Sequence, residues 1–141
     1  MVNATTLYLH AKSVVPCDDI RQEANGKFIL IGVYQGVIRV PVLPFHINLT
    51  WWIVASTSEI GSGSMNVRLR TDGGAVLFKG TLLMQINELS DTAIVLPPVP
   101  CQFQSEGRLF LEWRMNTENE TEWETINDLE IKLDPSLAPS S

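Results

Sequence analysis

Along most of this chain, apolar and polar residues alternate with a period of two, and turn-forming residues interrupt the alternation every eight to fifteen positions. This pattern is typical of β-strands with one buried face, because successive side chains of a strand point to opposite sides. Residues 64–71 and 107–115 show it most clearly. The side chains expected to point inward there are Met65, Val67, Leu69, Leu109, Leu111, Trp113 and Met115.

Strong turn signals separate the expected strands. Asn25-Gly26 and Asp72-Gly73-Gly74 favour tight hairpins, because these residues tolerate positive φ, and Pro97-Pro98 ends a strand. We expect eight or nine strands and no sustained 3.6-residue periodicity, with one weak helical segment at residues 18–24. Because short turns favour antiparallel neighbours, the chain is predicted to be an all-β protein, a two-layer antiparallel β-sandwich, with a closed β-barrel as the alternative.

Four segments carry predictions about their place in the sheets. Residues 27–34 are nearly all apolar, which indicates a central strand covered on both faces. Prolines confine residues 37–42 to an edge or to the end of a strand, and residues 61–64 are expected to form a flexible loop. Residues 75–87 are predicted to form a long strand with a bulge at Gly80.

The length of the chain, 141 residues, fits one ordinary domain, which we place at residues 1–134 and follow with a flexible C-terminal tail at residues 135–141. Hydrophobic residues make up 45% of the chain and charged residues 18%, which is typical of a globular protein rather than a disordered one. The N-terminus lacks both the basic start and the apolar stretch of a signal peptide. A cytoplasmic location is therefore expected.

The charge of the chain argues against nucleic acid as a partner. The formal net charge is −6, and the ten basic residues are scattered rather than clustered. The two cysteines, Cys17 and Cys101, could meet across a sandwich in an oxidising compartment. In the cytoplasm we expect two reduced thiols that pack as small hydrophobic groups.

One acidic segment has the composition of a cation site. Asp18 and Asp19 are adjacent, and Glu23 supplies a third carboxylate, in a segment expected to be an inter-strand loop. Calcium favours carboxylate clusters of this kind. The simpler interpretation is that one aspartate caps backbone amides while the other pairs with Arg21. Because no second acidic loop with metal spacing follows, we predict no metal site and keep an ion- or small-ligand-binding sandwich as the alternative function.

No residue pattern requires catalysis or a cofactor. Cys17 would need a nearby base to act as a nucleophile, and the chain has only His10 and His46. A hydrolase built on Cys17 and His10 is the least favoured reading, since neither a Cys-His-Asn signature nor a nucleophile elbow is present. Neither histidine has the spacing of a zinc ligand, and no phosphate-binding glycine motif occurs. The chain is predicted not to be an enzyme.

The aromatic residues point to protein contacts. Trp51 and Trp52 are adjacent, so one of them must face away from the core, and Phe110 shares a face with charged residues. Exposed aromatics of this kind often mark protein contacts or sugar-stacking platforms, and the simpler alternative is a small cluster beneath a loop. The leading prediction is a non-enzymatic protein-interaction or structural module with an unknown protein partner. A homodimer through residues 75–87 is a further possibility if that strand lies at a sheet edge.

Three short runs resemble a family of small bacterial and phage-borne proteins of unknown function. The runs are Cys17-Asp18-Asp19-Ile20-Arg21, Gly26-Lys27 and Leu30-Ile31-Gly32-Val33-Tyr34. The proline-rich steps at residues 41–45 and 96–100 are also similar, so that the likeness covers most of the chain but is specific only over residues 17–45. The resemblance implies a prokaryotic or phage protein of the cytoplasm. It implies no activity and no catalytic residues.

Overall fold

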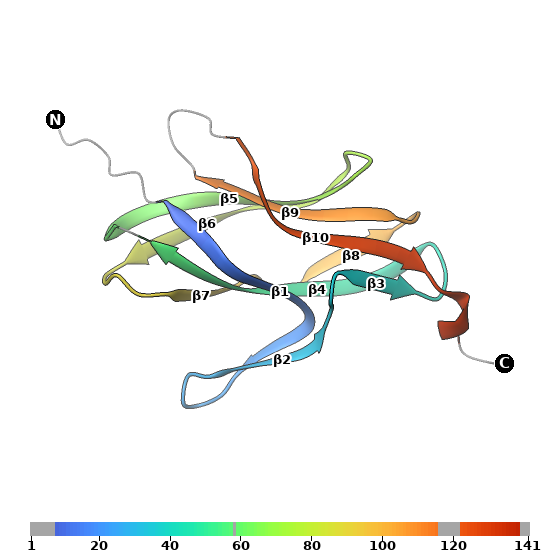
Figure 1. Ribbon diagram of the computed structural model, residues 1–141, viewed down its shortest axis with the longest axis horizontal. Helices are drawn as coiled ribbons and strands as arrows, with labels where there is room; N and C mark the ends of the chain where they lie inside the picture. Colours follow the sequence, from blue (N-terminus) through green and yellow to red (C-terminus); the bar gives the residue numbers. More distant parts are fainter. Residues whose placement is uncertain (1–7, 58, 116–121, 139–141) are drawn as a thin grey trace.

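The computed structural model describes residues 8–57, 59–115 and 122–138. In this part of the chain ten strands form two five-stranded sheets that pack face to face (Figure 1). The sheets do not close into a barrel, and the predicted β-sandwich is confirmed. One strand more is present than the eight or nine expected. It is β8 (Val99–Phe103), which was not predicted because it contains Pro100 and follows two further prolines.

The first sheet has the order β2-β1-β4-β7, and β8 extends it at one end by pairing with β4. Its strands are β1 (Leu9–Gln22), β2 (Phe28–Val33), β4 (Phe45–Thr57), β7 (Thr92–Val95) and β8. The length of β4 lets its second half pair with β7 and its first half with β8. All these pairs are antiparallel.

The second sheet has the order β3-β10-β9-β5-β6. Its strands are β3 (Val37–Val40), β5 (Gly61–Thr71), β6 (Val76–Ile86), β9 (Gly107–Met115) and β10 (Glu124–Leu133). Residues 37–40 lie at the edge that the prolines predicted. The β3–β10 pair is parallel, so this sheet is mixed rather than purely antiparallel.

The core lies between the sheets and follows the predicted alternation. Met65, Val67 and Leu69 of β5 are buried, as are the four inward residues predicted for β9. Trp51 of β4 and Trp113 of β9 are the largest side chains that are fully buried. Each Å² of apolar surface removed from water contributes about 25 cal/mol to stability, so large buried side chains such as these two make the largest individual contributions to the core.

The strongest correction concerns residues 27–34, which were predicted to form a central strand. They form β2, which is the edge of the first sheet, and Ile29, Ile31 and Val33 are exposed. An apolar run has the same appearance whether its outer face is covered within the domain or left open, so the pattern alone does not separate the two cases.

Smaller corrections concern local backbone. Residues 18–22 continue β1 instead of forming a helix, and residues 61–64 begin β5 instead of forming a loop. Gly80 pairs regularly with Val67, and the irregularity in this hairpin lies near Leu77 instead. Residues 135–137, in the predicted tail, form one turn of 3-10 helix that the Asp134 side chain caps.

Candidate functional site

The three carboxylates proposed as a cation site are not brought together. Asp18 and Asp19 lie in β1 rather than in a loop, and adjacent residues of a strand point to opposite faces. Asp18 accepts a hydrogen bond from the Tyr34 hydroxyl at 2.5 Å, while Asp19 pairs with Arg21 at 3.0 Å. Burial, together with the bond to the Asp18 carboxylate, raises the pKa of Tyr34.

Glu23, the third of these carboxylates, belongs to the hairpin turn. Its backbone amide donates to the carbonyl of Lys27 at 2.8 Å, and its carbonyl accepts from Gly26. Within residues 8–57, 59–115 and 122–138, no three His, Cys, Asp or Glu side chains are close enough together to hold a metal ion. The predicted pairing of one aspartate with Arg21 is confirmed.

The two thiols are free and buried, and Cys17 is distant from His10. Burial raises the pKa of Cys17, and it raises the pKa of Cys101 to about 12, so neither is a thiolate at neutral pH. His10 pairs with Ser56 at one end of β4, whereas Cys17 pairs with Thr50. Six residues of β1 lie between His10 and Cys17, which places the two about 20 Å apart. The Cys17–His10 arrangement therefore does not form.

The tryptophan pair divides between the two faces of the first sheet. Trp51 points into the core, and its indole Nε1 donates to Asn127 Oδ1 of the opposite sheet at 3.0 Å. Trp52 points to the other side and is half-buried. In register it lies between Val15 of β1 and Val95 of β7. Of the two, Trp52 is thus the candidate for protein contact.

Trp52 belongs to a larger apolar surface on the side of the first sheet that faces away from the core. Directly paired residues of antiparallel strands share a face, so Val33, Ile31 and Ile29 lie on the same side as their partners Cys17, Asp19 and Arg21. We call this surface the outer apolar face. It consists of Ile29, Ile31 and Val33 of β2, Val15 of β1, Trp52 of β4 and Val95 of β7.

Exposure differs across the outer apolar face. Ile29, Ile31 and Val33 are 43%, 43% and 48% exposed, and Val95 is 40% exposed. Val15 and Trp52 between them are half-buried. Apolar side chains thus occur on this side from one edge strand to the other, with Asp19 and Arg21 of β1 beside Ile31 and Ile29, although single exposed apolar residues are common on any protein surface.

The equivalent side of the second sheet is polar and internally paired. Glu112 of β9 is only 4% exposed, and its carboxylate accepts from Arg68 Nε at 2.8 Å and from Arg70 Nε at 2.9 Å. Burial opposes ionisation of this carboxyl, but the hydrogen bonds and charges of Arg70 and Arg68 outweigh it and lower the pKa of Glu112. A buried carboxylate between two guanidinium groups is thereby kept charged.

Aromatic rings complete this arrangement, which we call the arginine cluster and define as Arg68, Arg70, Glu112, Arg114, Phe110 and Trp123. The guanidinium carbons of Arg68 and Arg114 lie 4.1 and 4.4 Å from the centroid of the Trp123 ring. That of Arg70 lies 4.8 Å from the Phe110 ring. Phe110, one of the predicted protein-contact residues, is half-buried, and Arg70 of its own chain lies over its ring.

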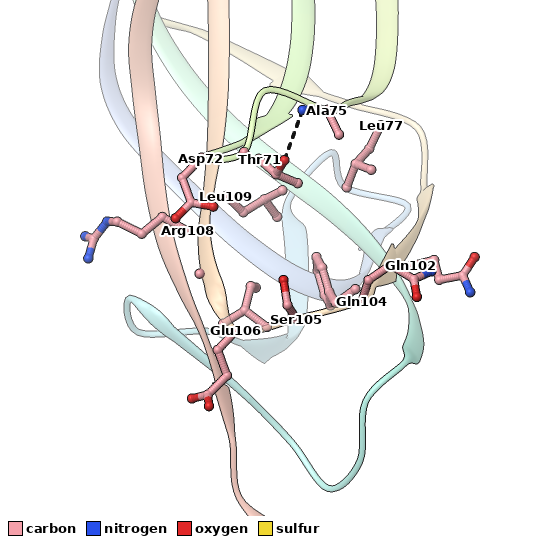
Figure 2. A pocket seen from close by; sticks show the side chains of 14 residues that line it. Thr71, Asp72, Ala75, Leu77, Gln102, Gln104, Ser105, Glu106, Arg108 and Leu109 are labelled. Atoms are coloured by element: carbon pink, nitrogen blue, oxygen red, sulfur yellow. Dashed lines mark hydrogen bonds between the residues drawn. The ribbon is translucent and has the colours of Figure 1, made fainter.

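A small cavity opens at one end of the sandwich (Figure 2). It encloses about 200 Å³ between the turn at residues 71–75 and the segment at residues 102–108. Leu77, Leu109 and Ile131 contribute its apolar lining. Thr71 Oγ1 accepts from the Ala75 amide at 3.1 Å, and Glu106 accepts from the Leu133 amide, so these polar groups already have partners within the chain.

The β2 part of the outer apolar face was not among the residues predicted from the sequence. The available signal was in β1, where Cys17, Asp19 and Arg21 occupy alternate positions. Two charged side chains on one side of a strand indicate that water reaches that side, and therefore that the paired strand is not covered there. The arginine cluster and the end cavity combine residues from distant strands and have no comparable local signal.

Comparisons with known proteins leave the family open. No protein-family model matches the chain, and no curated protein matches it. Among the described residues no helix has the length and apolar character needed to cross a membrane.

Proposed function

We propose that this chain is a non-enzymatic protein-interaction module and that its partner binds the outer apolar face. The observation that carries the proposal is the exposure of Ile29, Ile31, Val33 and Val95 on one side of one sheet, with Trp52 between them. Several exposed apolar residues on one side of a sheet often mark a protein contact, and aromatic residues near the centre of such a surface contribute most of the binding energy.

The charges around the outer apolar face favour a partner with an apolar surface rather than a strongly charged one. Asp19 and Arg21 pair with each other, and Lys12 of β1 donates to Asp91 at 2.8 Å across β4. The charges at this rim are therefore already compensated within the chain. A partner would gain by removing apolar area from water, with polar groups needed only at its edge.

The origin and compartment are part of the same proposal. The resemblance over residues 17–45 supports a bacterial or phage protein, and two free, buried thiols support a reducing compartment such as the cytoplasm.

A site-specific cross-linker tests the proposal. A photoreactive amino acid placed at Ile31 in the native host should become attached to a partner protein, which mass spectrometry identifies. The same group at Leu137, which is 51% exposed on the 3-10 turn, serves as the matched control and should not capture that protein. Binding is then measured between the two purified proteins. Ile31→Asp should weaken it at least tenfold and Leu137→Asp should not. Equal affinity of the two variants would contradict the proposal.

A further inference from the structure

Strand β6 forms the most extended edge in the described part of the chain. It is 11 residues long and hydrogen-bonds along only one side, to β5. The other terminal strands are β2, β8, β3 and β7, which have six, five, four and four residues. β6 contains no proline and one charge, Lys79. Short length, proline and charge are the usual protections of an edge, and β6 lacks the first two.

The most exposed apolar side chain on this edge is that of Leu83. Leu83 is 85% exposed and points to the outer side of the second sheet. On the inner side, Leu82 and Met84 pack against the core but remain half-buried. An additional strand along β6 would cover Leu83 and complete the burial of the two inner residues.

We infer that the occupant of this edge is a second copy of the chain, whose own β6 pairs antiparallel to the first about a two-fold axis at Leu83. A two-fold axis perpendicular to the sheet keeps inner residues opposite inner residues. With the axis at Leu83, the two Leu83 side chains face each other on the outer side. Leu82 then lies opposite Met84 of the second copy on the inner side.

The remaining pairs in this register are also compatible. Thr81 lies opposite Gln85, Gly80 opposite Ile86 and Lys79 opposite Asn87 of the second copy. Polar residues therefore meet polar residues on the outer side, and the two lysines are kept apart. Like charges directly opposite each other destabilise a strand pair, and this register contains none. The sequence of β6 is thus complementary to itself.

The dimer uses a surface separate from the outer apolar face, so the two proposals fail independently. Light scattering of the wild type from one to several hundred micromolar should show a rise from monomer to dimer mass. Leu83→Lys should give the monomer mass throughout, because it places two charges on the axis. Since Leu83 is 85% exposed, the substitution should leave the fold intact, which circular dichroism checks. Leu89→Lys, at a residue 61% exposed just beyond β6, is the matched control and should dimerise.

A cysteine substitution tests the register. Leu83→Cys should give a disulfide-linked dimer under mild oxidation, because paired residues at the axis bring their Cα atoms to roughly 5 Å. Val76→Cys, which is 50% exposed at the far end of β6, should not. The native thiols are buried and do not interfere. A wild type that stays monomeric at all concentrations, or a dimer that Leu83→Lys leaves intact, would overturn the inference. Equal partner affinity of Ile31→Asp and Leu137→Asp, with the dimer intact, would contradict only the proposed function.

Discussion

The two sheets of this sandwich share one core but treat their outer sides differently. The second sheet covers its outer side with the arginine cluster, in which a buried carboxylate, three guanidinium groups and two rings satisfy one another. The first sheet leaves apolar side chains on its outer side, at 40 to 48% exposure at its edges. Trp123 and Trp52 illustrate the difference, because the ring of Trp123 packs on arginines whereas Trp52 lies among valines.

This difference implies that one sheet's outer side contributes to stability and that the other's contributes to binding. The interactions of the arginine cluster are made within the chain, so that changing them should alter the free energy of unfolding. Ile29, Ile31, Val33 and Val95 of the outer apolar face are 40 to 48% exposed, so that changing them should alter binding and leave the free energy of unfolding nearly unaffected. Substitutions in the core, in the arginine cluster and on the outer apolar face measure that separation.

The largest loss of stability is expected for a substitution in the core. Trp113 is fully buried between the sheets, and Trp113→Ala removes its contacts and leaves a cavity. We expect a loss of about 3 to 5 kcal/mol in the free energy of unfolding. Urea denaturation measures it. A midpoint equal to that of the wild type would show that Trp113 does not support the core.

Glu112→Ala should have the next largest effect. It leaves Arg68 and Arg70 facing each other without the carboxylate that holds them. Removing one partner of a buried ion pair costs about 3 kcal/mol or more, and the partial exposure of both arginines favours the lower end. The control is Glu59→Ala, at an exposed residue, which should change stability by less than about 0.5 kcal/mol. Equal effects of the two substitutions would mean that the cluster is not stabilising.

The same residue gives a pH dependence with a definite sign. Because the folded-state pKa of Glu112 is lowered, its contribution is fully present above the unfolded pKa of about 4.3 and is lost as the pH falls through the folded value. The wild type should therefore lose more stability between pH 6 and pH 3 than Glu112→Gln, when both are measured by urea denaturation across that range. Other carboxylates, such as Asp134 with its lowered pKa, keep a residual slope in both proteins. The same pH dependence of stability in the two proteins would show that Glu112 does not contribute to it.

The smallest effect on stability is expected on the outer apolar face. Ile31→Asp places a charge where water already reaches, opposite Asp19 on the paired strand. The cost in unfolding free energy should stay below about 1 kcal/mol, including the lower strand propensity of aspartate. Thermal unfolding checks this value. A loss as large as that of Glu112→Ala would mean that this face is covered in the folded chain and is not a binding surface.

The sequence was sufficient to predict the sandwich and the inward faces of β5 and β9, because clean alternation depends only on each strand's own residues. It also placed residues 37–40 at an edge through the prolines. The sequence was not sufficient to place β2 at an edge. That position depends on which strands pair with β2, and only β1 does. Asp18 and Asp19 show the same limit. Their composition suggested a cation site, but the strand that contains them directs the two carboxylates to opposite sides.

The arginine cluster lay beyond sequence reasoning for a related reason. Its members come from β5, β9 and the segment just before β10, and their meeting depends on the register between those strands. Arg68 lies opposite Glu112 only because β5 and β9 pair with that register, and a shift by one residue would separate them. Local patterns contain no information about such a register.

The central claim, that the outer apolar face binds a partner while the arginine cluster does not, is tested most directly by a footprint of the complex. Amide hydrogen exchange would be compared between the domain alone and the domain saturated with the partner captured at Ile31. The account predicts slower exchange in peptides covering residues 28–33 and 50–54, with no change at residues 66–70 and 108–114. Protection at residues 66–70 and 108–114, with residues 28–33 unchanged, would contradict it.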